Sequence, residues 1–433
     1  MTPAARLQSA VTILEEIFTS PLPADSVISA HFRKNRYIGS KDRRAVTERL
    51  YRILRHYHRL SRHLPAVDAR ALVLADTVLL EEKDPRILFG HKEDRYGPDA
   101  LSAAEEAILQ TLTGKKLTDK NTPERIALEC PEWAYEMLKT ELDKNFQGVM
   151  TAMLAEAPLD LRVNILKTDR AALKAALEKE TGFSVEETPH SPWGLRISDG
   201  RPPLGQIKLF QDGLFEVQDE GSQLVALAAD AKPGMRVFDF CAGAGGKTLA
   251  LGMMMQNKGG ITAADISEGR LKRARLRFRR AGLHNIRTLH LSSESDKALK
   301  RGRGTYDIVL VDAPCTGTGT WRRDPDKKWR HVGPDLAELT ALQARILDSA
   351  AKLVKPGGKL VYATCSLLAA ENEDIFDAFL ENTPDFTPQN LRDAPHLKHI
   401  PFDGAYLRLL PSLHKTDGFF CAIAMRQKDE NQK

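Results

Sequence analysis

Hydrophobic residues recur along this chain with two different spacings. From about residue 6 to residue 110 they return every three or four positions, as Leu7, Val11 and Leu14 do, which predicts amphipathic helices. After the turn at residues 232–234, short apolar runs alternate with helical patterns until the end of the chain. The two spacings therefore predict an all-α N-terminal part and an α/β C-terminal part.

The alternation in the C-terminal part is typical of a parallel sheet covered by helices. The expected strands are residues 236–240, 260–264, 307–312 and 359–364. The expected helices are residues 249–255, 267–281, 334–354 and 371–380. Near the end of the chain, residues 406–410 and 419–425 are expected to form a hairpin at the sheet edge.

Changes of pattern also divide the first half of the chain. The helical array stops near Asn121-Thr122-Pro123. Beyond it, a helix that opens near Pro131 is followed by short strand-like pieces. We expect three domains, which are a helical domain of residues 1–122, a linker with a small α/β subdomain of residues 123–225, and a Rossmann-like α/β domain of residues 226–433.

Composition limits the compartment and the partners. Of 433 residues, 42% are hydrophobic, and no apolar run approaches the ~18 residues that a membrane span needs. The start of the chain lacks a basic segment followed by an apolar one, so no secretory signal is expected. Five cysteines without a Cys-X-X-Cys spacing argue against disulfides and a structural zinc site. We expect a cytoplasmic protein without membrane or metal, and a net charge of +5 leans only mildly toward anionic partners.

Two apolar runs of the C-terminal part end close to a cysteine. The first precedes Asp312 and Cys315, and the second precedes Cys365. Ligands of open α/β sheets gather at the carboxyl ends of such strands. A single cysteine is more often a buried small hydrophobic residue, which is our interpretation of Cys130 and Cys421. A pair of cysteines at two strand ends instead predicts a reactive site.

A glycine-rich loop follows the strand expected at residues 236–240 and opens a helix. Glycine lets the backbone approach a ligand closely, although a plain structural turn is the default for such a loop. Cys241 stands where a P-loop needs glycine, and Thr248 breaks a dinucleotide fingerprint. Methyltransferases that use S-adenosylmethionine have a similar loop and an acid at the end of the next strand, where Asp265 stands. The expected loop is Cys241, Ala242, Gly243, Ala244, Gly245, Gly246 and Lys247.

Two stretches are rich in basic residues. The helical pattern after Ser40 carries several arginines, including Arg43 and Arg44. A solvated face is the plain alternative, but arginines outnumber acids enough to suggest contact with RNA phosphates. Shortly after Cys315, basic residues are interleaved with tryptophan, which suits binding of an RNA backbone and stacking of bases. The residues of this second stretch are Arg322, Arg323, Lys327, Lys328 and Trp329.

Together these motifs resemble the RNA 5-methylcytosine methyltransferases of the Sun/NSUN family, and the RsmB-type bacterial rRNA enzymes most closely. The shared features span residues 130–425 and include the loop, the Asp312–Cys315 motif and the motif around Cys365. Residues 38–55 are similar to the NusB-like RNA-binding domain of RsmB-type enzymes. The resemblance implies an all-α NusB-like domain, a small α/β subdomain and a class I methyltransferase domain. It also implies S-adenosylmethionine as cofactor and small-subunit rRNA as partner, and we expect a monomer.

The chain departs from the family pattern at two places. The family loop usually reads Cys-Ala-Ala-Pro-Gly-Gly-Lys, whereas Gly243 and Ala244 stand in its middle here. The loss of the proline leaves the backbone donors of the loop intact. The family often has an acid near the adenine after the third strand, and Ser293 is our candidate for that contact.

The resemblance also implies a role for each residue. Carbon 5 of cytosine becomes nucleophilic once a thiolate has added to carbon 6. By resemblance, Cys365 makes that bond, Cys315 assists release of the product, and Asp312 holds the base. We expect Lys247 to help activate the thiol, and Asp265 and Asp312 to contact the cofactor.

Two alternatives stay open. A DNA cytosine-C5 methyltransferase would attack with Cys315 instead of Cys365. A non-catalytic RNA-binding ribosome assembly factor would keep the fold without the reaction. The presence of Lys247, Asp265 and both thiols argues against the second alternative.

Overall fold

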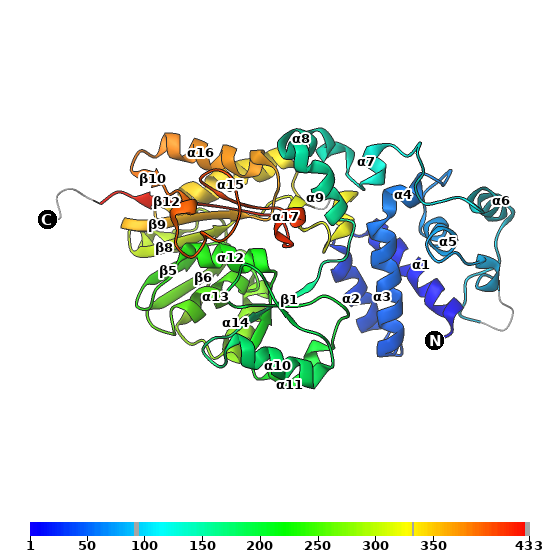
Figure 1. Cartoon of the computed structure of the whole chain (residues 1–433), viewed down its shortest axis with the longest axis horizontal. Helices are drawn as coiled ribbons and strands as arrows, with labels where there is room; N and C mark the ends of the chain where they lie inside the picture. Colours follow the sequence, from blue (N-terminus) through cyan, green and yellow to red (C-terminus); the bar gives the residue numbers. More distant parts are fainter. Residues whose placement is uncertain (91–94, 331–332, 429–433) are drawn as a thin grey trace. The chain divides into compact units, whose positions relative to one another are not determined.

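The computed structural model describes residues 1–90, 95–330 and 333–428 (Figure 1). The chain forms two units, which are described separately. Unit 1 is Met1–Glu156 with Trp321–Gly333, and unit 2 is Ala157–Thr320 with Pro334–Lys433. The division into three domains stays a prediction. The segment Trp321–Gly333, however, lies in the unit of the N-terminal helices and not in the unit that holds both candidate cysteines.

Unit 1 is built from helices, which confirms the all-α prediction for the N-terminal part. Its α-helices are α1 (Pro3–Thr19), α2 (Ala24–Lys34), α3 (Ser40–Arg55), α4 (Tyr57–Ser61), α5 (Ala69–Leu79), α6 (Ala103–Leu112), α7 (Glu124–Ala127), α8 (Glu132–Leu142) and α9 (Phe146–Ala152). The apolar stripes of α1, α3 and α5 meet in one buried core, to which Leu14, Leu50 and Leu72 belong. Burial of these stripes stabilises the helices more than their intrinsic propensity does.

Unit 2 begins with a small antiparallel sheet. Its strands are β1 (Leu159–Val163), β2 (Glu186–Glu187), β3 (Gly194–Ile197) and β4 (Phe215–Val217), in the order β2-β3-β1-β4. The helices that follow these strands are α10 (Arg170–Thr181), α11 (Lys208–Gln211) and α12 (Glu220–Ala229). Leu161 and Leu195 of this sheet pack with Leu173 and Leu177 of α10. The small α/β subdomain is thus present, as predicted.

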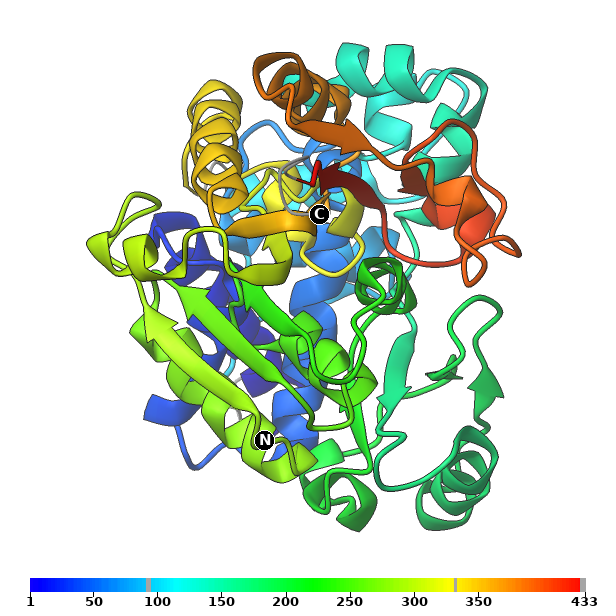
Figure 2. The ribbon, with the colours of Figure 1, turned by 90° about the vertical axis from the view of Figure 1, so that its left-hand side faces the viewer.

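The large sheet of unit 2 has eight strands among the described residues. They are β5 (Arg236–Asp239), β6 (Gly260–Asp265), β7 (Ile286–His290), β8 (Tyr306–Asp312), β9 (Val354–Thr364), β10 (Phe386–Pro388), β11 (Leu407–Leu409) and β12 (Phe419–Arg426). Their order is β10-β12-β9-β8-β5-β6-β7, with β11 also paired to β12. Figure 2 shows these strands side by side. The strands from β7 to β9 are parallel, and β12 is antiparallel to β9.

The chain reverses its direction across this sheet at β5. It runs outward from β5 through β6 to β7 and then returns to β8 on the other side of β5. Such a switch point leaves a crevice at the carboxyl ends of β5 and β8, where open α/β sheets bind ligands. The predicted loop follows β5, and Asp312 is the last residue of β8.

Helices cover both faces of the large sheet. The helices between and after its strands are α13 (Gly246–Met254), α14 (Glu268–Ala281), α15 (Leu336–Ala351), α16 (Glu373–Asn382) and the short α17 (Pro411–His414). In Figure 1, α15 and α16 lie on one face, and α12, α13 and α14 lie on the other.

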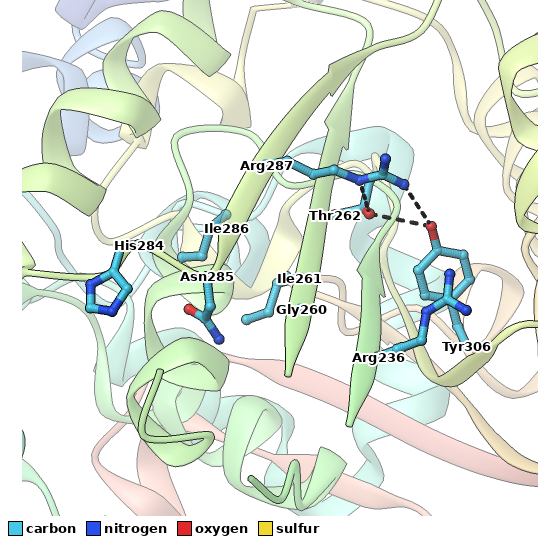
Figure 3. A pocket seen from close by; sticks show the side chains of 9 residues that line it. All are labelled: Arg236, Gly260, Ile261, Thr262, His284, Asn285, Ile286, Arg287 and Tyr306. Atoms are coloured by element: carbon cyan, nitrogen blue, oxygen red, sulfur yellow. Dashed lines mark hydrogen bonds between the residues drawn. The ribbon is translucent and has the colours of Figure 1, made fainter. Parts of the chain in front are cut away.

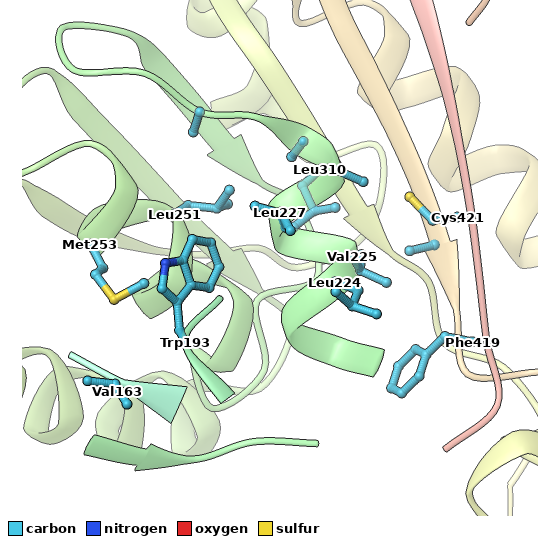
Figure 4. Close-up of a cluster of buried hydrophobic side chains, with 14 of the residues drawn as sticks. Val163, Trp193, Leu224, Val225, Leu227, Leu251, Met253, Leu310, Phe419 and Cys421 are labelled. Carbon is cyan, nitrogen blue, oxygen red and sulfur yellow. The ribbon is translucent and has the colours of Figure 1, made fainter. Parts of the chain in front are cut away.

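The alternation of side chains along β8 explains its continuous apolar run. Ile308 and Leu310 belong to the core cluster beneath α12, which Figure 4 shows with Leu224. Val309 and Val311 belong to the cluster on the opposite face, beneath α15. Both sets are buried, as predicted for a strand covered on its two faces.

The sheet differs from the prediction at both of its ends. The predicted hairpin forms from β11 and β12, but β12 is an interior strand because it pairs with β9 on one side and with β10 and β11 on the other. The prediction of an edge hairpin is therefore wrong for β12. The edge strand β7 was not predicted, since its residues are half-buried or exposed and include Arg287 and His290, so no apolar run marks it.

Candidate active site

The two candidate thiols lie together at the tips of neighbouring strands. Cys315 follows β8, and Cys365 follows β9. These strands are parallel and paired, with Asp312 opposite Ala363. The Sγ atoms of Cys315 and Cys365 are 3.4 Å apart. The structure thus brings together the two cysteines that the sequence placed at two strand ends.

Lys247 lies in the first turn of α13 and forms an ion pair with Asp312. Its Nζ atom is 2.8 Å from Oδ2 of Asp312, and it lies 5.2 Å from the centre of the Phe419 ring. Lys247 is only 7% exposed. Burial alone would lower the pKa of this lysine, but the charge of Asp312 and the hydrogen bond to it raise the pKa, with a further contribution from Cys365. Lys247 is therefore a fixed positive charge near Asp312 and Cys365.

The two thiols have neighbours of opposite charge. Cys365 interacts electrostatically with the Lys247 ammonium. The hydrogen bond to Cys365, burial and the charges of Cys365 and Glu371 together raise the pKa of Cys315 well above its ordinary value. A cation favours a thiolate and a carboxylate disfavours one, so the two thiols stand in different electrostatic surroundings.

The glycine-rich loop is held by its carbonyl groups. Arg277 Nη1 donates to the carbonyl of Ala244 at 2.7 Å, and Arg162 Nη1 donates to the carbonyl of Gly246 at 2.8 Å. Gly245 has φ +80°, and a Cβ atom there would lie 2.5 Å from the Phe278 ring. The loop therefore needs glycine at this position for both its backbone conformation and its packing.

Asp265 ends β6, as the cofactor prediction requires. Its Oδ2 atom accepts the N–H of Gly243 at 2.8 Å, and its Oδ1 atom accepts the N–H of Ser267 at 2.7 Å. These bonds fix the carboxylate next to the loop. Ser293 lies after the neighbouring strand β7, and its Oγ atom is 3.2 Å from that of Ser295. Its contact with adenine stays a prediction.

The loop and its surroundings suit S-adenosylmethionine. A Cβ atom added to Gly243 would meet no heavy atom of the described residues within 4 Å, so open space lies beside the loop. The buried Oδ1 atom of Asp239, at the end of β5, has no hydrogen-bond partner among the described residues. A polar group of a bound cofactor can satisfy this oxygen. The residues present therefore fit the group that the fold implies.

Asp239 is a site residue that the sequence reasoning missed. The predicted loop begins at Cys241, two positions later, and the prediction gave Asp239 no role. Burial, opposed by the hydrogen bond from Thr248, raises the pKa of Asp239 to about 7. Its position at the end of a strand next to the glycine-rich loop was the available signal, the same one that identified Asp265.

The residues predicted to bind RNA lie in unit 1, and several of them form hydrogen bonds, ion pairs or ring contacts within the protein. Arg43 Nε donates to the carbonyl of Ile38 at 2.7 Å, and its guanidinium lies 5.7 Å from the centre of the Phe32 ring. Arg44 forms an exposed ion pair with Glu48 at 2.8 Å. Of these two arginines, Arg44 is the more accessible.

The second basic stretch is largely enclosed. The Trp329 indole stacks on the Tyr57 ring at 4.1 Å, and its N–H donates to the carbonyl of Leu54 at 3.1 Å. Lys328 is only 1% exposed and Arg322 is 6% exposed. This arrangement does not support direct RNA contact by these three residues, because neighbouring helices already cover them.

The remaining two residues of this stretch are half-buried. Lys327 Nζ pairs with Asp324 at 2.9 Å. Arg323 is likewise of intermediate exposure. Their role in RNA binding stays a prediction.

A hollow of about 390 Å³ lies at the opposite end of the large sheet, beside the start of β5 and β6 (Figure 3). Arg287 donates to Thr262 at 2.9 Å and to the Tyr306 hydroxyl at 3.3 Å. None of the residues predicted for the active site lines this hollow. It is separate from the crevice at the carboxyl ends of the strands.

Within the described part of the chain, no helix is both long and apolar enough to span a membrane. The same residues contain no group of three or more His, Cys, Asp or Glu side chains that could hold a metal ion.

The strand order, the loop at the switch point and the acid after β6 define the class of protein. They are the features of a Rossmann-like methyltransferase, in which S-adenosylmethionine is the methyl donor. The family follows from comparison with known proteins. Residues 226–425 match the family 16S rRNA methyltransferase RsmB/F, and residues 130–202 match the ferredoxin-like domain of RsmF/B-like methyltransferases.

Individual proteins that are similar to this chain carry names of the same family. A probable ribosomal RNA small subunit methyltransferase B of Synechocystis sp. is 33% identical over 315 residues, covering 71% of this chain and 70% of the relative. A relative of the same name from Bacillus subtilis is 38% identical over 275 residues, covering 62% of this chain and 59% of the relative. The crystal structure of PH0851 has a TM-score of 0.77 and 25% identity, covering 98% of this chain and 99% of that chain. The chain therefore belongs to the RsmB/F family of 16S rRNA methyltransferases.

Proposed function

We propose that this protein methylates carbon 5 of a cytosine in small-subunit rRNA, with Cys365 as the nucleophile. The observation that carries the proposal is the pair of thiols 3.4 Å apart, next to the Lys247–Asp312 ion pair. A reaction in which one thiol bonds to the substrate and a second assists release needs such a pair. The relatives are named small-subunit rRNA methyltransferases, which supports rRNA as the substrate.

The reaction begins with addition of the Cys365 thiolate to carbon 6. A bond forms between sulfur and carbon 6, and the electron pair of the ring double bond moves toward carbon 5, which becomes nucleophilic. Lys247 supports the thiolate, and Asp312 at the tip of β8 holds the edge of the base. S-adenosylmethionine supplies an electrophilic methyl group when it is bound.

Release of the product needs an elimination. Carbon 5 loses its hydrogen as a proton to solvent water, and the electron pair of that bond moves to restore the ring double bond. The bond between sulfur and carbon 6 breaks, and its electron pair returns to the Cys365 sulfur as a thiolate. The Cys315 thiol, 3.4 Å from the departing sulfur, donates a hydrogen bond to it. Because the hydrogen bond to Cys365, burial and the charges of Cys365 and Glu371 raise the pKa of Cys315, that thiol keeps the proton it needs for this role.

The proposal also assigns roles to the remaining predicted residues. Residues 241–247, Asp265, Ser293 and Asp312 hold the cofactor, together with Asp239. Arg44, with smaller contributions from Arg43, Arg323 and Lys327, binds the RNA backbone. We expect the protein to act as a monomer in the cytoplasm.

The test removes each thiol in turn. Cys365→Ala should abolish transfer of radiolabelled methyl groups to small-subunit rRNA, and Cys315→Ala should accumulate a protein–RNA adduct that survives denaturing electrophoresis. Cys130→Ala, which removes a buried thiol in unit 1, is the matched control and should form product at the normal rate.

Two results would contradict the proposal. An active Cys365→Ala variant beside an inactive Cys315→Ala variant without adduct would move the nucleophile to Cys315, as in a DNA cytosine-C5 methyltransferase. Failure of the full chain to bind S-adenosylmethionine in calorimetry would favour a non-catalytic assembly factor.

A further inference from the structure

The turn between β9 and α16 contacts both cysteine loops through two adjacent side chains. These are Glu371, at the end of the 3-10 helix Ala369–Glu371, and Asn372, which precedes α16. Both residues are buried, with exposed fractions of 0% and 1%. The Tyr362 hydroxyl donates to the carbonyl of Glu371 at 2.6 Å and fixes the backbone of this turn.

Glu371 holds the loop that carries Cys315. Its Oε1 atom accepts the backbone N–H of Thr316 at 2.8 Å, and its Oε2 atom accepts the Thr316 hydroxyl at 2.5 Å. Gln343 Nε2 donates to the same carboxylate at 3.0 Å and to the carbonyl of Pro314 at 2.8 Å. The residues on both sides of Cys315 are therefore tied to this carboxylate, one directly and one through Gln343.

Asn372 holds the loop that carries Cys365 in the same way. Its Oδ1 atom accepts the Thr364 hydroxyl at 2.5 Å, and its Nδ2 atom donates to the carbonyl of Ser366 at 3.1 Å. Cys365 thus stands between two residues that bond to one amide. Because Glu371 and Asn372 are neighbours in the chain, the two cysteine loops share a single anchor.

We propose that Glu371 and Asn372 are positioning residues that set the separation of the Cys315 and Cys365 thiols. Their value to catalysis rests on the proposed function, whereas their effect on the spacing of the thiols does not. A buried carboxylate that accepts hydrogen bonds from three groups cannot be replaced by an amide without loss, because an amide has only one acceptor oxygen. Glu371→Gln should therefore loosen the Cys315 loop while nearly preserving the volume of the side chain.

A dithiol reagent measures the spacing directly. Phenylarsine oxide reacts with two adjacent thiols, so that two As–S bonds form and the two protons leave with the oxygen as water. The full-length protein should bind one equivalent and lose two reactive thiols. Glu371→Ala and Asn372→Ala should each weaken this binding by about tenfold or more, since loosened loops must be reordered before both bonds can form.

The controls separate position from folding. Cys315→Ala should not form the cyclic adduct. Glu373→Ala removes a neighbouring acid that pairs with Arg408 at 2.6 Å, and it should bind the reagent as the unmodified protein does. If Glu371→Ala fails to fold, Thr316→Val removes the hydroxyl on the opposite side of the same contact, and it should weaken binding in the same direction.

Kinetic measurements add a second readout. Glu371→Gln should lower kcat about 10- to 100-fold with little change in KM for RNA or S-adenosylmethionine, because misplacement of a reacting group has effects of this size. Normal reagent affinity in stably folded Glu371→Ala, Asn372→Ala and Thr316→Val variants would overturn the positioning role. A failure of the proposed function would look different, since the unmodified protein would then bind the reagent but form no 5-methylcytosine.

Discussion

Two buried lysines of this protein, Lys247 and Lys328, have pKa values shifted in opposite directions. Lys247 in unit 2 lies 2.8 Å from the Asp312 carboxylate, and its pKa is raised because the charge of Asp312 outweighs burial. Lys328 in unit 1 is equally enclosed, but its Nζ atom has no hydrogen-bond partner among the described residues. Burial lowers the pKa of Lys328 to about 8, and the charge of Glu129 only partly opposes this shift.

The difference shows what decides the role of a buried cation. A lysine that meets a carboxylate at short range is a permanent charge on which a reaction can depend. A lysine without such a partner is costly to keep charged, and it contributes mainly by packing of its alkyl chain. Both residues looked equally functional in the sequence, since each is a basic residue inside a candidate motif.

The largest effect is expected from Lys247→Met. Loss of the cation beside Cys365 should lower kcat for methyl transfer by about 100-fold or more, since fixed charges at a reacting centre contribute factors of this size. Lys258→Met removes an exposed lysine beyond the same helix and is the matched control. Single-turnover methylation of rRNA checks the result, and activity within threefold of normal would remove Lys247 from the mechanism.

Lys328→Met, in contrast to Lys247→Met, should be favourable, because it should stabilise the protein. The folded-state pKa of Lys328 is about 8, below its ordinary value of 10.5. Between these pH values the unfolded state holds a proton that the folded state has lost, so the free energy of unfolding rises as pH rises from 8 to 10.5. Below pH 8 this gain is absent. At pH 7 the substitution should therefore raise the free energy of unfolding by about 1–3 kcal/mol. Urea denaturation at pH 7 and pH 10 measures both the gain and its disappearance.

The neighbouring residue provides the control for Lys328. Lys327 is half-exposed and pairs with Asp324, and Lys327→Met should change stability by less than about 1 kcal/mol. Equal destabilisation by both substitutions would mean that Lys328 is paired in solution.

A smaller effect on stability is expected from substitution of Asp239, which lies near Lys247. Its pKa is raised from 3.8 to about 7, so the folded state keeps a proton that the unfolded state has lost, and stability falls as pH rises from about 4 to 7. Asp239→Asn should remove this fall and stabilise the protein at pH 8 by about 2 kcal/mol. Thermal unfolding of both proteins at pH 5 and pH 8 tests this prediction. If the substitution left the pH dependence of stability unchanged, Asp239 would not be a buried carboxyl that stays protonated in the folded state.

The smallest effect is expected for RNA binding by the exposed Arg44. Arg44→Gln should weaken rRNA affinity about two- to fivefold and reduce the salt dependence by about one phosphate contact. Filter binding at several salt concentrations measures both quantities. Arg52→Gln would instead destabilise unit 1, because Arg52 pairs with the buried Asp76.

The site in unit 2 was more predictable from the sequence than the surroundings of the basic residues in unit 1, for a physical reason. In unit 2, the strand pattern fixes which residues follow the carboxyl ends of β5, β6, β8 and β9, so Cys315 and Cys365 could be placed together without knowing any long-range contact. Their anchors Glu371 and Asn372 were not predicted. Their hydrogen bonds depend on loop conformations that no periodicity encodes.

In unit 1, the partners of the basic residues could not be predicted because they are distant in sequence. Arg49 and Arg52 of α3 meet Asp76 and Glu81 near the end of α5. A count of arginines over acids within one helix misses such partners. Trp329 likewise pairs with Tyr57, more than 200 positions earlier in the chain.

This last contact has a consequence for dissecting the protein. Unit 1 is interrupted in the chain, since Trp321–Gly333 is made long after α1–α9. On the ribosome, the helices emerge without the indole that will cover Tyr57, so the hydrophobic surface stays open until that segment is synthesised. A fragment that ends at Glu156 would lack Trp329, so the hydrophobic surface around Tyr57 would stay exposed. An independent helical module would need the later segment to be grafted onto it.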